Sequence, residues 1–424
     1  MKKSTSKAFW LCLVIFSFMG QVAWVVENMY FNVFIYKMFA ASAADISAMV
    51  GASAVCATLT TVFMGALSDR IGKRKLFICL GYILWGISIL AFVFVREDYI
   101  SAVFGATVSA AAVGVSLSII LDCVMTFFGS SANDAAFNAW LTDSTDGSNR
   151  GAAEGINSMM PLVSILAVFG GFMFFDLEKR ESWSLIFVII GALVLLAGIL
   201  GIFLIREPAI TPVRDSYIKT VLYGFRPRTV RENRRLYVSL LAFIVFNISI
   251  QIFMPYLIIY YEVSLGMKDY VLVMAPAIII ASVVTAFWGR LYDKKGFRLS
   301  GSVAVAMLLC GYAVLFIARA KLPVFCGSLL MMSGYLSGMA SFGALIRECT
   351  PEGYAGRLQG VRIFSQVLIP GVVGPFIGER ILANAELLTN SDGTTSFVPN
   401  ANIFLGAGIA LLFLLPVFFK KKTK

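Results

Sequence analysis

The sequence predicts an all-α membrane protein in which twelve transmembrane helices form two pseudo-symmetric six-helix bundles. Apolar runs of about 18 residues or more, the length that crosses a bilayer, recur along nearly the whole chain. Of the 424 residues, 59% are hydrophobic and 14% are charged, whereas a soluble domain carries about 25% charged residues. Two short motifs each occur twice, once in each half of the chain. We therefore expect two related halves embedded in a membrane.

The apolar runs divide the chain into an N-terminal bundle (1–205), a basic linker (206–235) and a C-terminal bundle (236–424) with a short basic tail. The predicted spans are 9–37, 46–67, 76–95, about 117–141, 152–175, 184–205, 236–262, 270–289, 300–319, 323–346, 358–382 and 402–419. The stretch 99–117 is rich in Ala, Gly, Ser and Val. It extends the third or fourth helix or lies at the membrane interface, and the sequence leaves both open.

Basic residues predict the orientation. Most of the 35 Lys and Arg residues fall in the termini, the linker and the loops on the same side of the membrane. Cytoplasmic loops carry an excess of Lys and Arg, so we expect a multi-pass protein of the cell membrane with both termini in the cytoplasm. The net charge of +11 is then loop charge and indicates no nucleic-acid partner.

One repeated motif, G-x-L-x-D-x-x-G-x-R, follows the second and eighth predicted spans. Its glycines permit a tight turn, and its Asp can accept hydrogen bonds at a helix N-terminus or pair with a basic residue. Contacts that form in only one conformation bias the equilibrium between inward- and outward-facing states, although basic loops also serve simply to hold the orientation. The expected gating residues are Gly65, Asp69, Arg70, Gly72, Arg74, Gly289, Asp293, Gly296 and Arg298.

A second motif supports the duplication. F-N-A-W-L-T-D at Phe137–Asp143 precedes G-A-A-E-G at Gly151–Gly155, and F-G-A-L-I-R-E at Phe342–Glu348 precedes G-R-L-Q-G at Gly356–Gly360. The repeated loops resemble the signatures of the major facilitator superfamily between helices two and three and between helices eight and nine. The run D-x-T-(x)4-R-G-(x)3-G, which begins at Asp143, resembles that superfamily's loop between helices four and five. The resemblance implies two six-helix bundles around a central cavity, with alternating access by rocking of the halves.

Placement within that superfamily is open. The fifth predicted helix lacks the G-P-x-x-G-G motif of drug/proton antiporters, and a partial counterpart lies at Gly371–Gly378 in helix eleven instead. Segment 46–67 contains no acidic residue, so the helix-two sodium site of the melibiose-type symporters is not expected.

Three acidic residues inside predicted spans are the candidates for proton coupling: Glu27, Asp122 and Asp134. A carboxylate in hydrocarbon costs several kcal/mol unless it is paired, protonated or faces water. Glu27 has no Lys or Arg within a helical turn or two. Asp122 shares one helical face with Thr126, Gly129 and Asn133, which fits a cavity lining or a polar helix–helix contact. The alternative for each acid is a structural hydrogen bond to a neighbouring helix.

Amides and aromatic rings in the first and seventh predicted helices are the candidates for substrate binding. Together with Thr126 and Asn133 in helix four, they are Gln21, Trp24, Asn28, Asn32, Asn247, Gln251 and Tyr256. Amides bind hydroxyl groups and ring faces pack against C–H groups, as a neutral polyhydroxylated ligand requires. No Lys or Arg lies at mid-membrane, which argues against strongly anionic substrates. An interfacial aromatic belt is the other interpretation of rings near helix ends.

The chain lacks His, a Cys-x-x-Cys pair and a G-x-x-x-x-G-K-S/T phosphate loop. We therefore expect no metal, no cofactor, no ATP hydrolysis and no enzyme activity. The expected function is secondary active transport of a small organic solute, with a sugar or glycoside as the leading substrate class and a proton as the coupling ion for uptake. The alternatives are a proton-coupled exporter of lipophilic cations and a non-transporting membrane sensor on the same scaffold. We expect a monomer whose partners are the solute, the proton and the bilayer.

Overall fold

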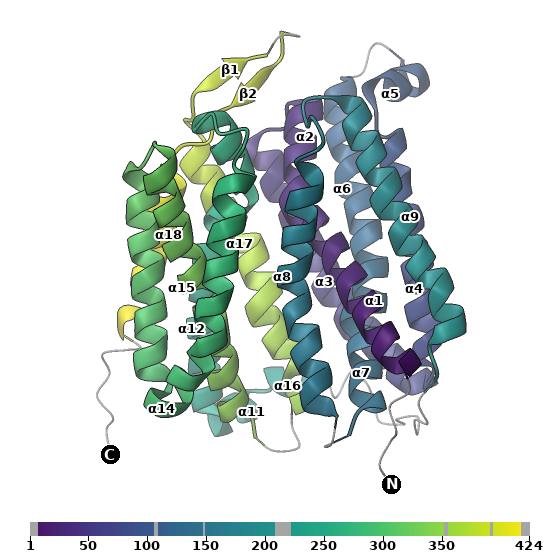
Figure 1. Ribbon diagram of the computed structural model, residues 1–424, viewed down its shortest axis with the longest axis vertical. Helices are drawn as coiled ribbons and strands as arrows, with labels where there is room; N and C mark the ends of the chain where they lie inside the picture. Colours follow the sequence, from purple (N-terminus) through teal and green to yellow (C-terminus); the bar gives the residue numbers. More distant parts are fainter. Residues whose placement is uncertain are drawn as a thin grey trace. The chain divides into compact units, whose positions relative to one another are not determined.

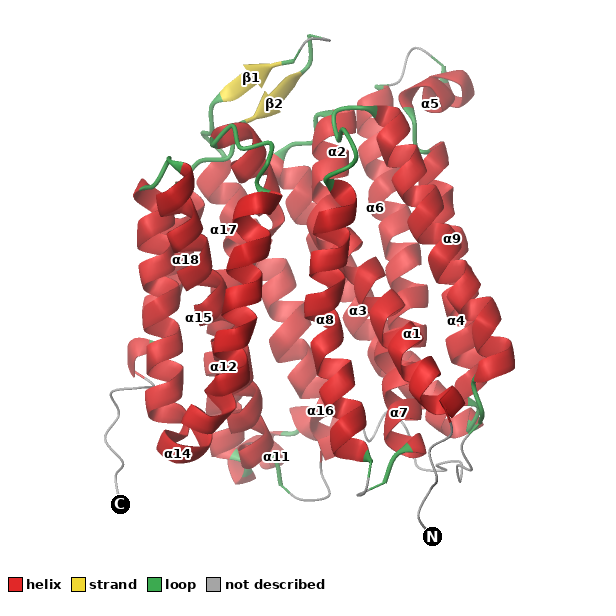
Figure 2. Ribbon diagram, viewed as in Figure 1, coloured by secondary structure: helices red, strands yellow, loops and turns green. Residues whose placement is uncertain are grey.

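The computed structural model describes residues 7–105, 109–146, 149–207, 222–351, 355–390 and 393–416. Nearly all of these residues are helical (Figure 1, Figure 2). Long apolar helices are expected in a bilayer, because a helix satisfies its backbone hydrogen bonds internally. The chain forms two compact units, one made of Met1–Ala41 with Ala52–Tyr217 and the other of Ser42–Gly51 with Ile218–Lys424.

Within the described residues, ten helices are long and apolar enough to cross a membrane. One of them, α14 (Val271–Ile317), contains two predicted spans merged across Gly296, whose φ of 71° and ψ of 178° are not helical. A shorter apolar helix, α18 (Asn402–Leu412), corresponds to the last predicted span. Dividing α14 at Gly296 and adding α18 accounts for the twelve predicted crossings.

The first unit contains six spans. Their elements are α1 (Lys7–Val25), η1 (Val26–Tyr30) and α2 (Phe31–Phe39); α3 (Ala43–Ile71); α4 (Arg74–Ala91) and η2 (Phe92–Phe94); α6 (Ala110–Gly129), η3 (Ser130–Phe137) and α7 (Asn138–Ser144); α8 (Arg150–Phe172); and α9 (Arg180–Leu204). The first residues of α3 belong to the second unit by their contacts. A short helix, α5 (Glu97–Phe104), separates the third and fourth spans.

The second unit begins, in its described part, with η4 (Leu222–Phe225) and α11 (Pro227–Glu232). Its further elements are α12 (Arg234–Phe253), η5 (Met254–Tyr256), α13 (Leu257–Ile259) and η6 (Tyr260–Ser264); α14; α15 (Lys321–Cys349); α16 (Ala355–Ile363), η7 (Phe364–Leu368) and α17 (Ile369–Leu382); β1 (Leu387–Thr389) and β2 (Thr395–Phe397); and α18. The two strands form an antiparallel hairpin in which Leu387 faces Phe397.

The stretch 99–117, for which the sequence left open an extension of the third or fourth helix or an interfacial segment, divides between α5 and an earlier start of the fourth span at Ala110. The strands β1 and β2 were not predicted. Parts of the basic linker (208–221) and of the C-terminal tail (417–424) lie outside the described residues, as do the side chains of most of the Gly356–Gly360 motif.

Glycines let the helices of each unit approach closely. In the first unit, a Cβ on Gly86 of α4 would lie 2.5 Å from the main-chain nitrogen of Leu195 in α9. In the second unit, a Cβ on Gly311 would lie 2.5 Å from the main-chain nitrogen of Met331. Small residues at such contacts are typical of membrane helices, whose association depends on close packing.

The duplicated motif has the same backbone feature in both copies. Gly72 has a φ of 70° and Gly296 a φ of 71°. A positive φ is readily adopted only by glycine, which explains why the motif places glycine there twice.

In the part of the chain that the structure describes, four spans contain a π-helical segment: η1 with Glu27, η3 with Asp134, η6 in the seventh span and η7 in the eleventh. Segments of this kind inside α-helices are frequent at functional sites. The segments η1 and η3 supply candidate residues of the first unit.

Candidate functional site

Glu27 lies buried in the first unit, with only 6% of its surface exposed. Its Oε1 accepts hydrogen bonds from Ser53 Oγ and from Thr126 Oγ1, each at 2.9 Å. The two hydroxyl oxygens are themselves 2.9 Å apart. The first, second and fourth spans therefore meet at one carboxyl group.

Asp122 lies one helical turn before Thr126 in α6 and is 2% exposed. Its carboxyl group interacts electrostatically with Glu27 and also with the Ser53 hydroxyl. Glu27 Oε2 and Asp122 Oδ1 are buried and form no hydrogen bond within the described part of the chain. We call Glu27, Ser53, Asp122 and Thr126 the Glu27 cluster.

Asp134 lies in η3 and accepts a hydrogen bond from Ser130 Oγ at 3.1 Å. It neighbours the Trp24 ring and acts electrostatically on Glu27. The Trp24 ring packs against Trp85, with their centroids 5.0 Å apart. The three predicted acids are therefore electrostatic neighbours in the first unit.

Ser53 was missed by the sequence analysis. It lies in an apolar span that also contains Ser47, Thr58 and Thr60. Nothing in the local pattern distinguishes it from these residues, because its role depends on acids that arrive from other helices.

Asn133 does not join Thr126, although helical spacing places both on one face. Its Nδ2 donates to Tyr82 Oη at 2.6 Å, and it packs against Gly20 of α1. The π-helical segment η3 begins at Ser130, between the two residues, and changes the angular step of the helix. The predicted polar face therefore divides between the Glu27 cluster and a contact with α1 and α4.

The predicted amides of the first span differ in environment. Asn28 is exposed, and its Nδ2 donates to the main-chain oxygen of Trp24 at 2.8 Å. Asn32 is buried, and its Nδ2 donates to the main-chain oxygen of Asn28 at 3.2 Å. Gln21 is half-buried. The amide groups of Asn28 and Asn32 thus bond within their own helix.

The predicted residues of the seventh span lie in the second unit. Asn247 Nδ2 donates to the main-chain oxygen of Phe243 at 2.8 Å. Gln251 packs against Gly374 of α17. The buried Tyr256 hydroxyl lies within hydrogen-bond distance of two main-chain oxygens, that of Ala43 at 3.1 Å and that of Pro375 at 3.3 Å. Asn247 and Gln251 therefore lie within or against α12 and α17, and Tyr256 also contacts the start of α3.

The first motif loop is held by Arg74, which is only 5% exposed. Its guanidinium contacts Asp69 Oδ1 at 2.5 Å, Asp143 Oδ2 at 3.0 Å and Ser68 Oγ at 2.5 Å. Asp69 pairs with an arginine of its own loop, and it does not cap the following helix. That helix, α4, is capped by Glu207, whose two carboxylate oxygens accept the main-chain N–H groups of Arg74 and Lys75 at 2.6 and 3.0 Å.

Glu207 was also missed by the sequence analysis. It directly follows Arg206 at the start of the basic linker, where an isolated acid gives no signal of its target. A carboxylate at a helix N-terminus is favoured by the free N–H groups and the helix dipole.

The second motif loop is more open. Asp293 and Arg298 are exposed, and nothing lies within 4 Å of a Cβ built on Gly289 or Gly296. In the first copy, Arg70 is exposed, while a Cβ built on Gly65 would lie 3.8 Å from the Ala135 side chain. The two copies share a glycine with positive φ and differ in their side-chain contacts.

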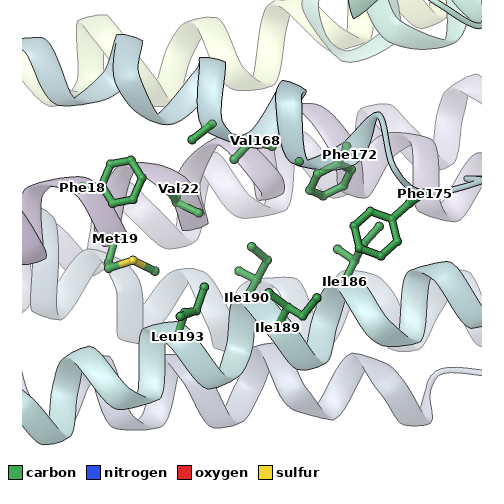
Figure 3. A pocket seen from close by; sticks show the side chains of 12 residues that line it. Phe18, Met19, Val22, Val168, Phe172, Phe175, Ile186, Ile189, Ile190 and Leu193 are labelled. Atoms are coloured by element: carbon green, nitrogen blue, oxygen red, sulfur yellow. The ribbon is translucent and has the colours of Figure 1, made fainter.

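A cavity of about 220 Å³ lies between α1, α8 and α9 of the first unit. Figure 3 shows that its lining is apolar, with Phe18, Val22, Phe172 and Ile190 around it. It offers no side-chain hydrogen-bond partner, so it does not suit a polyhydroxylated solute. Among the described residues, no group of three or more His, Cys, Asp or Glu side chains is arranged to hold a metal ion.

Two units of membrane-spanning helices with duplicated signature loops define the class of multi-pass membrane transporters. The chain belongs to the Major Facilitator Superfamily, whose sequence profile matches residues 9–375. The predicted family and fold class are thereby confirmed, and the chain is a transporter and not an enzyme.

Three solved structures illustrate the likeness. A mutant form of the nucleoside transporter NupG is 12% identical, with 97% of this chain and 99% of that chain covered and a TM-score of 0.76. The xylose transporter XylE from E. coli, in a partially occluded inward-open conformation, is 14% identical, with 98% and 100% covered and a TM-score of 0.70. A bacterial homologue of the human lysosomal transporter Spinster, inward-facing and occupied, is 16% identical, with 98% and 97% covered and a TM-score of 0.70. None of the curated proteins matches the chain in sequence.

Proposed function

We propose that this transporter takes up a small, neutral, polyhydroxylated solute together with a proton, and that Glu27 carries the proton. The Glu27 cluster is the observation that supports this proposal most directly. Two carboxyl groups are buried beside hydroxyls, and the ionisable groups that act on them are acids or thiols. A carboxyl group in such a place is stable only when it is neutralised, and a transporter can make that neutralisation conditional on its state.

Sugars and glycosides are the substrate class that we favour. Gln21, Asn28 and Gln251 supply amides with partial exposure, and amides bind hydroxyl groups without requiring charge. The nucleosides and xylose named for NupG and XylE are also neutral and carry several hydroxyl groups, which is consistent with this class.

We further propose alternating access controlled at the motif loops, with both termini in the cytoplasm, in a monomer of the cell membrane. The Arg74 contacts support a gating role, because they join the loop after the second span to Asp143 at the end of the fourth. Such contacts bias the conformational equilibrium if they form in only one state.

The test begins with ligand identification. The detergent-purified protein is screened by thermal shift against sugars, glycosides and nucleosides on one side and lipophilic cations on the other. A ligand that binds only the folded protein raises its stability. Stabilisation by a neutral polyhydroxylated compound supports the proposal.

The coupling role of Glu27 is then tested in proteoliposomes with the compound found in the screen. Glu27→Gln should abolish accumulation driven by a proton gradient and leave counterflow exchange largely intact, because exchange needs no net proton movement. The matched control is Glu178→Gln, which removes an exposed carboxylate paired with Lys37. Unchanged accumulation in Glu27→Gln would remove Glu27 from the coupling role.

The second candidate is a proton-coupled exporter of lipophilic cations. The same observation favours it, because two buried carboxyl groups on which no basic group of the described residues acts would attract a cation directly. Stabilisation by lipophilic cations, and loss of that stabilisation in Asp122→Asn, would support the exporter.

A further inference from the structure

We infer that the Glu27 cluster also binds a sodium ion, in competition with the coupling proton. This inference rests on the proposed function only in taking the cluster as the coupling site. It extends the site from a proton carrier to a site for a small hard cation.

The first argument concerns the unbonded oxygens. Glu27 Oε2 and Asp122 Oδ1 are buried and accept no hydrogen bond within the described residues, although both side chains are more than nine-tenths buried. A buried charged oxygen without a partner is strongly unfavourable. One proton neutralises one carboxyl group, whereas one cation can contact oxygens of both.

The second argument concerns the neutral ligands. Ser53 Oγ and Thr126 Oγ1 donate to Glu27 Oε1 at 2.9 Å, so their lone pairs remain available to a cation. Hard cations are held by carboxylate, hydroxyl and carbonyl oxygens. The cluster brings two carboxyl groups and two hydroxyls together from three spans.

The third argument is charge. The ionisable groups that face the two carboxyls are Asp134 from η3 and the thiols of Cys56 from α3 and Cys123 from α6. None of them is basic. The site therefore carries negative charge whenever its carboxyls ionise. A monovalent ion can offset that charge with two carboxyl groups. It does not require a group of three or more His, Cys, Asp or Glu side chains, and the described residues contain no such group placed to hold a metal ion.

The backbone at Glu27 favours the same assignment. Glu27 lies in η1, where the N–H of Phe31 bonds to the main-chain oxygen of Val26 five residues earlier. Single π-helical turns inside α-helices are frequent at functional sites. Here the acids come from the first and fourth spans and the second span contributes Ser53, so the site does not need an acid in segment 46–67.

Thermal unfolding of the purified protein in NaCl, with choline chloride at equal ionic strength as the reference, tests the inference. We expect NaCl to raise the melting temperature in a saturable manner. The rise should be larger at alkaline than at acidic pH, because ionised carboxylates bind the ion and protons displace it. Binding of radioactive sodium to the same preparation measures the site directly.

Four variants locate the site. Glu27→Gln and Asp122→Asn should each abolish the sodium-specific rise, and Ser53→Ala and Thr126→Val should each shift the half-saturating sodium concentration at least several-fold upward. Glu178→Gln, an exposed acid outside the cluster, should keep the full response. If Glu27→Gln fails to fold, two other measurements still test the inference. They are the sodium-specific rise in the melting temperature of Asp122→Asn and the direct binding of sodium to Ser53→Ala.

The inference is overturned if NaCl and choline chloride give the same melting temperature at every pH, if the sodium response survives in Asp122→Asn, or if the half-saturating sodium concentration of Ser53→Ala equals that of the wild type. Uptake in sodium-free medium separates the two hypotheses. Proton-driven uptake without any sodium effect would contradict this inference alone, whereas sodium binding without proton-driven uptake would contradict the proposed function alone.

Discussion

The guanidinium of Arg74 lies 3.0 Å from the carboxylate of Asp143 and joins the start of the third span to the end of the fourth. Because the same guanidinium also contacts Asp69 and Ser68, one nearly buried arginine organises the whole motif loop. The duplicated counterparts Asp293 and Arg298 are exposed. The structure therefore places an organised motif loop in the first unit and a more open one in the second.

Replacing Arg74 by Gln should destabilise the protein and slow transport. Two partly exposed carboxylates lose their common partner, and we expect a loss of about 1–3 kcal/mol, below the value for a fully buried pair. Thermal unfolding measures the first effect and initial transport rates the second.

Asp69→Asn should perturb the loop less than Arg74→Gln, because Arg74 retains its ion pair with Asp143. It should slow transport while ligand affinity stays within a few-fold of the wild-type value. A large loss of affinity in Asp69→Asn would contradict the gating role. A double-mutant cycle of Asp69→Asn and Asp143→Asn should show non-additive stability changes, since both residues share one guanidinium.

The spans and the duplicated loops were predictable because they depend on local properties of the sequence. Hydrocarbon length requires long apolar runs, and a positive φ requires glycine at 72 and 296. These constraints act on each segment before any tertiary contact forms. The hairpin of β1 and β2 was not predictable in this way, because its strands are only three residues each.

The candidate site was predictable only in part. Glu27 and Asp122 stand out because an acid in an apolar span is costly wherever it faces. Ser53 and the position of Asn133 could not be predicted, since the first depends on other helices and the second on the π-helical step that begins at Ser130. Periodicity calculated for a regular α-helix fails beyond such a step.

Gly296→Ala should be strongly destabilising. Its φ of 71° with ψ of 178° lies in a region that is essentially restricted to glycine, so we expect a cost of about 1–3 kcal/mol. The matched control is Gly289→Ala in the same motif, where a Cβ meets nothing within 4 Å. Equal melting temperatures for the two variants would contradict the strain argument.

The pair of Lys321 and Asp269 should make a small, pH-dependent contribution to stability. The Lys321 ammonium donates a hydrogen bond to Asp269 Oδ2 at 2.5 Å. This contact holds the pKa of the Asp269 carboxyl below its usual range. The contribution is thus present at neutral pH and is lost as the pH falls through the lowered pKa. Both groups are well exposed, so Lys321→Gln should cost only about 0.2–1 kcal/mol.

Unfolding of wild type and Lys321→Gln across a pH series checks this prediction. The difference between the two proteins should shrink in acid and in high salt. A difference that grows on acidification would show that Lys321 stabilises through another contact.

Gly86→Ala should loosen the packing of α4 on α9. The added Cβ would lie 2.5 Å from the main-chain nitrogen of Leu195, and a main-chain atom cannot move aside as a flexible side chain can. Overpacking of this kind costs about 1–3 kcal/mol, so the melting temperature should fall. Gly170→Ala in α8 is the control, because a Cβ there meets nothing within 4 Å and alanine favours the helix. If Gly86→Ala melts at the wild-type temperature while Gly170→Ala is destabilised, the close approach of α4 and α9 does not determine the stability of the first unit.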